Sequence, residues 1–294
     1  RPFFCVHMFT FGFHKAGLPE DAEERAQMMD RMERDMKCWA VLLGHMTGFA
    51  SIKAWCTLQQ AFKDSLLGAS FVVGLAIIVL GLLTAAVDYV RHHIIELDGT
   101  RDVNEDLWDE EVRDTMKDVF GLTISFLIVQ TLRFALGGNM PDPSGYLPPS
   151  RALPPMKTAI LFSIGLGLAI CAFVRVAVIR SHVNEVASLI LLVCNFVFAW
   201  AIMFAVDANM ETKEGLDTEG DTLGFVITAL IITMFGFACI FILDPLADAH
   251  HANKHVSAGI VSLVETLGIL IGFSWERSFD SAVDDISVGL NQGV

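Results

Sequence analysis

The chain has 294 residues, of which 53% are apolar and 18% are charged, and its formal net charge is −14. A soluble domain of this length would carry about a quarter charged residues, so the composition excludes an ordinary soluble fold. So acidic a chain is also unsuited to the phosphate backbone of nucleic acid, which we exclude as a partner. The composition therefore predicts an integral membrane protein whose first partner is the lipid bilayer.

Apolar residues are gathered into long runs, which a bilayer requires because about 20 helical residues cross about 30 Å of hydrocarbon. Four runs are almost uninterrupted: Leu66–Val90, Lys157–Ile179, Val186–Val206 and Leu223–Leu243. Three more are partly polar but long enough: Cys38–Phe62, Val119–Leu136 and Val256–Trp275. We expect an all-α, polytopic membrane helical bundle that forms a single transmembrane domain over residues 1–294, with seven of its helices in these runs.

A further apolar segment, Pro2–Phe13, stands at the start of the sequence, which begins at Arg1 without an initiator methionine. We interpret it as the end of another transmembrane helix, which would raise the number of spans from seven to eight. An interfacial anchor or a processed N-terminus are the alternatives.

The six cysteines are Cys5, Cys38, Cys56, Cys171, Cys194 and Cys239, and all lie in or beside apolar runs. They form no CxxC pair, which indicates small packing residues and no disulfide framework.

Positive charge is distributed unevenly between the two sets of connections. The connections 15–37, 91–117, 175–185 and 244–255 hold twelve of the twenty Lys and Arg residues. The positive-inside rule then places these connections, which also carry most of the histidines, on the cytoplasmic, stromal or matrix side of the membrane.

The more polar runs share a short motif, which is seen in GFASIKAW (Gly48–Trp55), SFLIVQTL (Ser125–Leu132), NFVFAWAI (Asn195–Ile202) and GFSWERSF (Gly272–Phe279). Its phenylalanines, Phe49, Phe126, Phe196 and Phe273, lie 77, 70 and 77 residues apart, the length of a two-helix unit. We predict four tandem two-helix repeats over approximately 1–64, 65–145, 146–215 and 216–294. The alternative is that the motif only reflects helix-to-helix packing through Phe and small residues.

Polar side chains inside apolar runs are costly, so they usually face protein or water and mark functional sites. Glu265 lies well inside the last run, and His45, Lys53, Gln130 and Asn195 lie inside others. We predict that these five side chains line a path for a small cation or proton, with the polar helix of each repeat facing a central axis. Arg133, Glu276 and Arg277 lie near run ends, which is typical of interfacial anchors or local ion pairs.

Asp244, Asp248, His251 and His255 follow the sixth complete run at steps of four, three and four residues, one face of a helix if Pro245 begins a new helix. Carboxylate and imidazole groups in this arrangement could bind a divalent transition metal as a cofactor. Histidines at headgroup level with no metal are the alternative.

Three classes of function remain. The first is a channel or carrier for a small cation or proton. The second is a non-catalytic structural subunit of a larger assembly, which would have other membrane subunits as partners. The third is a metal-dependent membrane enzyme, although no Walker loop, dinucleotide fingerprint or nucleophile elbow occurs in the sequence. Transport predicts water-accessible polar residues around an axis, whereas a structural subunit predicts a dry, packed bundle.

Overall fold

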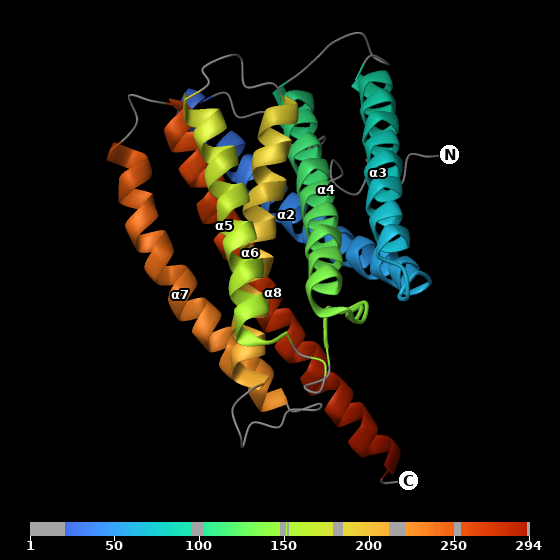
Figure 1. The fold of residues 1–294 in the computed structure, drawn as a ribbon. Coiled ribbons are helices and arrows are strands. Elements are labelled where there is room, and N and C mark those ends of the chain that lie inside the picture. The colour runs from blue at the N-terminus through green and yellow to red at the C-terminus, as the bar shows by residue number, and fades with distance from the viewer. Residues whose placement is uncertain are drawn as a thin grey trace.

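The computed structural model describes residues 21–95, 103–147, 151, 153–178, 185–211, 222–249 and 254–292. This part of the chain is all-α and contains seven helices (Figure 1). In chain order they are α2 (Ala22–Gln60), α3 (Leu66–Ile95), α4 (Val103–Gly137), α5 (Pro155–Val178), α6 (Glu185–Glu211), α7 (Thr222–Ala249) and α8 (Lys254–Gln292). The predicted helical segment Pro2–Phe13 lies outside the described residues.

Six of the seven described helices are long and apolar enough to cross a membrane, namely α3, α4, α5, α6, α7 and α8. These six candidate spans confirm the prediction that the chain is a multi-pass membrane protein in contact with lipid. The predicted span Cys38–Phe62 is helical, as part of α2, but α2 is not among the six. Its hydropathy is lower because His45, Lys53 and several Gly, Ser and Thr residues interrupt the apolar side chains.

Successive helices run in opposite directions and pack as neighbours (Figure 1). The pairs α3–α4, α5–α6 and α7–α8 are in contact, and α4 also packs against α2 and α6. As a result α2, α4, α6 and α8 all run in the same sense through the bundle. Pro245 lies inside α7, so the helix continues past it to Ala249 and does not restart there.

Burial distinguishes α4 and α6 from the other spans. Within the apolar window of each span, 67% of α4 and 56% of α6 is buried, against 33% of α8, 28% of α5 and 22% of α3 and of α7. We call α4 and α6, with α2 and α8 that pack against them, the inner helices, and α3, α5 and α7 the outer helices. The outer helices α3, α5 and α7 carry many exposed apolar side chains, such as Leu67, Phe71 and Phe241. Apolar side chains on the outside are the expected surface of a bundle that is surrounded by lipid.

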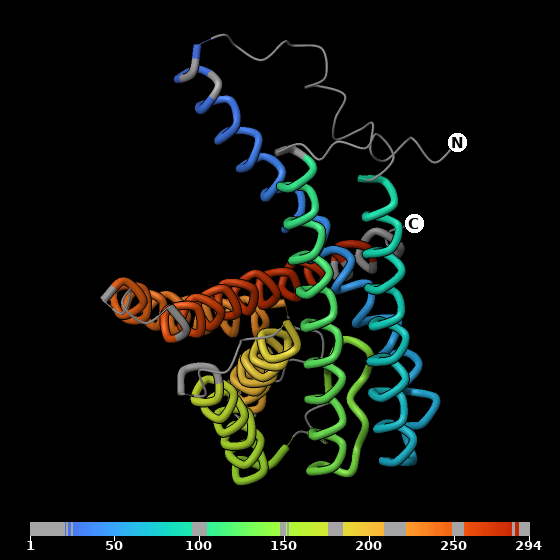
Figure 2. The backbone as a smooth tube through the Cα atoms, turned by 90° about the horizontal axis from the view of Figure 1, so that it is seen from above, coloured from blue at the N-terminus to red at the C-terminus, as the bar shows by residue number. Residues whose placement is uncertain are grey.

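The two longest helices extend well beyond the rest. The helices α2 and α8 have 39 residues each, so each is about 58 Å long, roughly twice the hydrocarbon thickness. Asp21 caps the start of α2, where its carboxylate accepts a hydrogen bond from the Glu23 amide at 3.1 Å. Figure 2 shows the first turns of α2 projecting away from the bundle.

A buried ion pair fastens α3 to α4 where both helices leave the apolar layer. The Arg91 guanidinium contacts the carboxylate of Asp109 at 2.6 Å and that of Asp88 at 2.7 Å, and it donates to the Asp109 carbonyl at 3.1 Å. The side chains of Arg91 and Asp109 are 4% and 9% exposed. If Arg91 or Asp109 were replaced by a neutral residue, the buried charge of the other would lose its counter-charge.

We predict that Asp109→Ala lowers the free energy of unfolding by about 3 kcal/mol, because Arg91 then keeps, among the described residues, only the partly exposed Asp88 as a charged partner. The measurement is unfolding in mixed micelles, followed by tryptophan fluorescence. Asp30→Ala, which breaks the exposed pair between Asp30 and Arg34, is the control and should cost less than about 1 kcal/mol. Equal effects of the two substitutions would contradict the role given to the buried pair.

Candidate functional site

An aromatic cluster lies where the inner helices meet. The ring of Trp200 on α6 lies 4.7 Å from that of Phe273 on α8 and 5.2 Å from that of Phe126 on α4, both edge to face. Phe49 of α2 joins the cluster through Phe273, at 5.1 Å between ring centres. Edge-to-face pairs of this kind are among the more stabilising aromatic contacts. Three of the four motif phenylalanines therefore meet at one place.

The fourth motif phenylalanine, Phe196, is also buried, but Trp200, one turn further along α6, occupies the central position in its place. The side chains of Phe126, Phe196 and Trp200 are at most 1% exposed. The meeting point of the inner helices is thus filled by large, buried apolar rings.

Short hydrogen bonds tie the same helices together around the cluster. The Thr123 hydroxyl of α4 donates to Ser51 of α2 at 2.9 Å, and the Trp200 indole donates to Ser125 of α4 at 2.9 Å. Asn195 of α6 donates to Ser262 of α8 at 3.2 Å. Buried polar groups in lipid need such partners, so these side chains are used for helix packing.

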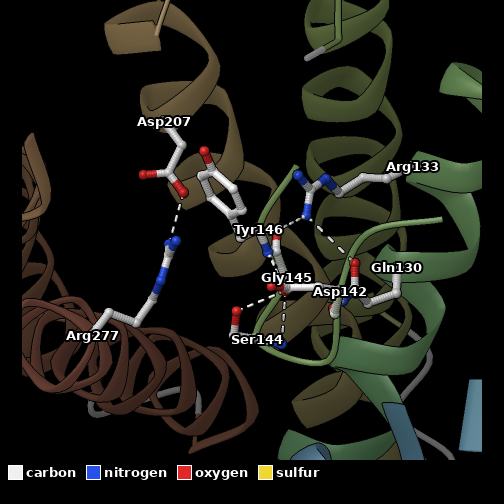
Figure 3. Close-up of polar contacts among 8 residues, drawn as sticks. All are labelled: Gln130, Arg133, Asp142, Ser144, Gly145, Tyr146, Asp207 and Arg277. Atoms are coloured by element: carbon white, nitrogen blue, oxygen red, sulfur yellow. Dashed lines mark hydrogen bonds and ion pairs between the residues drawn. The ribbon is translucent and has the colours of Figure 1, made fainter. Parts of the chain in front are cut away.

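A polar site with two arginines lies beyond the aromatic cluster, near the C-terminal ends of α4 and α6. Figure 3 shows its side chains. The Arg133 guanidinium donates to the Gly145 carbonyl at 2.6 Å and to Gln130 Oε1 at 3.4 Å, and it stacks over the Phe204 ring at 3.8 Å. Gln130 in turn donates to the Asp142 carbonyl at 2.9 Å. Both side chains thereby hold the loop 138–147 against the end of the bundle.

The loop itself is folded around one carboxylate. Asp142 Oδ1 accepts hydrogen bonds from the Ser144 amide at 2.9 Å, the Ser144 hydroxyl at 2.7 Å and the Tyr146 amide at 2.7 Å. Such Asx turns are favoured by Asp at the start of a turn. The turn places Gly145 at φ +85°, in the left-handed region that favours glycine.

The second arginine joins the site from α8. Arg277 pairs with Asp207 of α6 at 2.7 Å, and both side chains are nearly buried, at 11% and 13% exposure. This contact confirms the interpretation of Arg277 as a member of a local ion pair. A small pocket lies between the two arginines and is lined also by Tyr146, Asp207, Phe204 and the loop (Figure 3).

The five residues predicted to line a transport path have different environments. Gln130 and Asn195 are buried and take part in the hydrogen bonds described above. His45 is half-buried and stacks on Phe49 at 6.2 Å, while Lys53 is exposed on α2. Glu265 is exposed on α8. Of the five, only Gln130 approaches the two-arginine site, through its contact with Arg133.

Glu265 interacts with charged groups of two other helices. Its charge interacts with Asp118 on α4 and with Lys37 on α2. Asp118 directly precedes the apolar run of α4, which begins at Val119. Asp118 and Glu265 each lie eight residues before a phenylalanine of the aromatic cluster, or about 12 Å along the helix. Glu265 therefore lies about as far from the aromatic cluster along α8 as Asp118 does along α4.

The predicted metal ligands do not share one helix. Asp244 and Asp248 are exposed near the end of α7, whereas His255 belongs to the start of α8. Because α7 passes through Pro245, no new helix begins at that residue, and the segment 250–253 that would join the four residues lies outside the described residues. His251 and the side chain of His255 lie outside the described residues. Among the described residues no group of three or more His, Cys, Asp or Glu could hold a metal ion, so the divalent metal stays a prediction.

Sequence reasoning missed Asp207, Tyr146 and the role of the loop 138–147. Asp207 directly follows the apolar run Val186–Val206 and belongs to no repeating pattern of polar residues that would mark it as part of a site. The Asp-Pro-Ser-Gly sequence at 142–145 was visible as a turn signal. The turn signal does not reveal that the Arg133 side chain, twelve residues before Gly145, donates a hydrogen bond to the Gly145 carbonyl of this turn.

The chain has no match among known protein families, curated proteins or solved structures. Function has to be argued from the geometry alone.

We predict that Gly145→Ala destabilises the protein more than Gly138→Ala. Both glycines have positive φ, +85° and +76°, so each substitution costs about 1–2 kcal/mol from the backbone alone. At Gly145 an added Cβ would also lie 2.9 Å from the Phe204 ring and 3.1 Å from the Phe126 ring, whereas at Gly138 it would meet nothing within 4 Å. Thermal unfolding measures the difference, and equal losses would show that the loop is not packed on these rings.

Proposed function

We propose that the protein is a non-catalytic structural subunit of a larger membrane assembly. The observation that carries this proposal is the aromatic cluster, which fills the place where a path between the inner helices would run. A pore or carrier cavity requires side chains that water can reach. Here Phe126, Trp200 and Phe273 close the centre, and the neighbouring Ser125 and Asn195 bond to other helices.

The surfaces outside the apolar layer suit such a role. The first half of α2 extends beyond the bundle and carries exposed charged side chains of both signs: Glu23, Glu24, Asp30, Arg31, Glu33, Arg34, Asp35 and Lys37. A helix that carries mixed charge on its exposed faces can pair with a complementary partner through many weak contacts. We infer that this extension docks the neighbouring subunit on the side of the histidine-bearing connections.

We also propose that the chain arose from four tandem two-helix units, and that the histidine-bearing connections face the cytoplasm, stroma or matrix. The 77-, 70- and 77-residue spacing of the motif phenylalanines supports the first proposal. The like orientation of α2, α4, α6 and α8, and the meeting of Phe49, Phe126 and Phe273, agree with it. The excess of Lys and Arg on one side supports the second.

Transport of a small cation or proton is the second candidate, and one observation favours it. Two carboxylates, Asp118 and Glu265, interact across α4 and α8 at the edge of the apolar layer. Acidic groups in such a place attract cations. In that case the aromatic cluster would be a closed gate, and it would have to move for ions to pass.

Cysteine accessibility distinguishes the two candidates. In a cysteine-free background, Ser125→Cys and Asn195→Cys should not react with a charged, membrane-impermeant thiol reagent, because both positions are buried beside the aromatic cluster. Ser144→Cys, on the exposed loop, is the matched control and should react fully. Labelling at both buried positions would favour a water-filled path and transport.

A flux assay in proteoliposomes is the second test. If the protein is a structural subunit, vesicles that contain it should pass protons and monovalent cations no faster than protein-free vesicles. If it is a transporter, the wild-type protein should raise the flux and Glu265→Gln should remove the increase. Asp280→Asn, at an exposed position further along α8, is the control and should leave any flux unchanged.

A further inference from the structure

The end of α8 continues well past the apolar layer. The apolar run of this helix ends at Trp275, and the helix goes on without a break to Gln292. Residues 276–292, which we call the α8 extension, are about 25 Å long. Figure 1 shows them projecting past the ends of the other helices. Because α8 is one continuous helix, its extension follows the line of the span out of the apolar layer and cannot lie flat on the lipid surface.

One side of the α8 extension is apolar and exposed. The side chains of Phe279, Val283 and Ile286 are 64%, 62% and 63% exposed. Their spacing of four and three residues places them within about 60° of one another around the helix. Leu290 continues this spacing in the sequence. Apolar residues at alternate steps of four and three are the pattern of the a and d positions in paired helices.

The rest of the bundle contacts the opposite side of the α8 extension. Arg277 pairs with Asp207 of α6 at 2.7 Å, and Ser281 shares a hydrogen bond with Thr222 of α7 at 3.3 Å. Arg277 and Ser281 each lie about 160° around the helix from Phe279. The apolar stripe therefore faces away from the helices that hold α8. Exposed apolar patches beyond the reach of lipid are typical of sites that bind another protein.

The charge of the α8 extension limits the partner. The extension carries four acidic residues, namely Glu276, Asp280, Asp284 and Asp285, and its one basic residue, Arg277, is paired with Asp207. Lys53 of α2 interacts with the charge of Glu276, which still leaves an excess of negative charge. A partner with positive charge is therefore favoured.

Two other occupants fit this charge poorly. A second copy of the chain, paired in the same orientation, would bring the acidic residues of two extensions together. The connection 212–221 of this chain, which lies outside the described residues, has four acidic residues and one lysine. Like charges across a helix pair are unfavourable, so both are less suited to the stripe than a basic helix.

We propose that the α8 extension docks an amphipathic helix of a neighbouring subunit, with apolar residues at its a and d positions and Lys or Arg beside them. The apolar residues of that helix cover Phe279, Val283 and Ile286, and its cations meet the carboxylates of the extension. The proposal rests on the structural role proposed above, because a member of an assembly has such a neighbour. It adds a contact at the opposite end of the bundle from the start of α2, since α2 and α8 run in the same sense.

The test is the binding of a synthetic probe to the full chain in phosphatidylcholine nanodiscs. The probe is a fluorescent helical peptide with Leu at the a and d positions and Lys at e and g, and the matched peptide has Glu in place of Lys. Fluorescence anisotropy measures both affinities, with protein-free nanodiscs as the blank. We expect the basic peptide to bind about tenfold more tightly than the acidic one. Absence of binding, or no preference for the basic peptide, would overturn the proposal.

Variants then locate the binding. The double variant Val283→Asn with Ile286→Asn should bind the basic peptide about a hundredfold more weakly, because two apolar contacts are lost. Both side chains are exposed, so the variant should fold. Met156→Asn changes an exposed apolar residue at the start of α5 and is the matched control, which should bind as the wild type does. Unchanged binding in the double variant would place the peptide elsewhere and overturn the proposal.

The mass of the wild-type chain without peptide tests the second-copy alternative. Light scattering should find one chain per detergent micelle, which leaves the stripe free. A dimer that the double variant separates would show that a second copy covers the stripe, and would overturn the proposal. Failure of docking in these experiments leaves the proteoliposome result unchanged, whereas a cation flux that depends on Glu265 would contradict the structural role itself. The two failures are therefore distinguishable.

Discussion

The contact of Trp200 with Phe126 and Phe273 is the interaction on which the rest of this structure depends. It joins α4, α6 and α8 at one point, and Phe49 brings α2 to the same point. Lipid offers no hydrophobic driving force between helices, so their association depends on close packing and on hydrogen bonds across the contact. The interlocked rings supply the packing, and Ser51, Thr123, Ser125 and Asn195 supply the hydrogen bonds.

The aromatic contact also explains why polar groups are arranged in two levels. On one side of the rings, the charge of Glu265 interacts with those of Lys37 on α2 and Asp118 on α4. On the other side, Gln130, Arg133, Asp207 and Arg277 hold the ends of the helices and the loop 138–147. Charged side chains are least costly where water and headgroups can reach them. Buried aromatic rings therefore lie between two groups of polar side chains, an arrangement that agrees with the structural role proposed above.

Much of the architecture could be predicted from the sequence, because long apolar runs have few alternatives in a bilayer. Five predicted runs, 66–90, 119–136, 186–206, 223–243 and 256–275, lie within candidate spans, and the sixth, 157–179, overlaps the span Pro155–Arg175. The motif phenylalanines indicated which helices would meet. What the runs could not reveal is which charges of other helices come near: Glu265 lies inside its own run, and it interacts with the charges of Lys37 on α2 and Asp118 on α4. Pairings such as Arg277 with Asp207 join residues 70 apart in sequence, and no local pattern signals them.

The water exposure of the Trp200 indole tests the dry centre most directly. The chain is labelled with 5-fluorotryptophan in lipid nanodiscs, and the Trp200 resonance is assigned by its loss in Trp200→Phe. The fluorine shift is then compared in H₂O and D₂O. A packed structural core predicts no solvent isotope shift for Trp200. A shift comparable to that of free fluorotryptophan would show water at the centre of the bundle and would contradict the account.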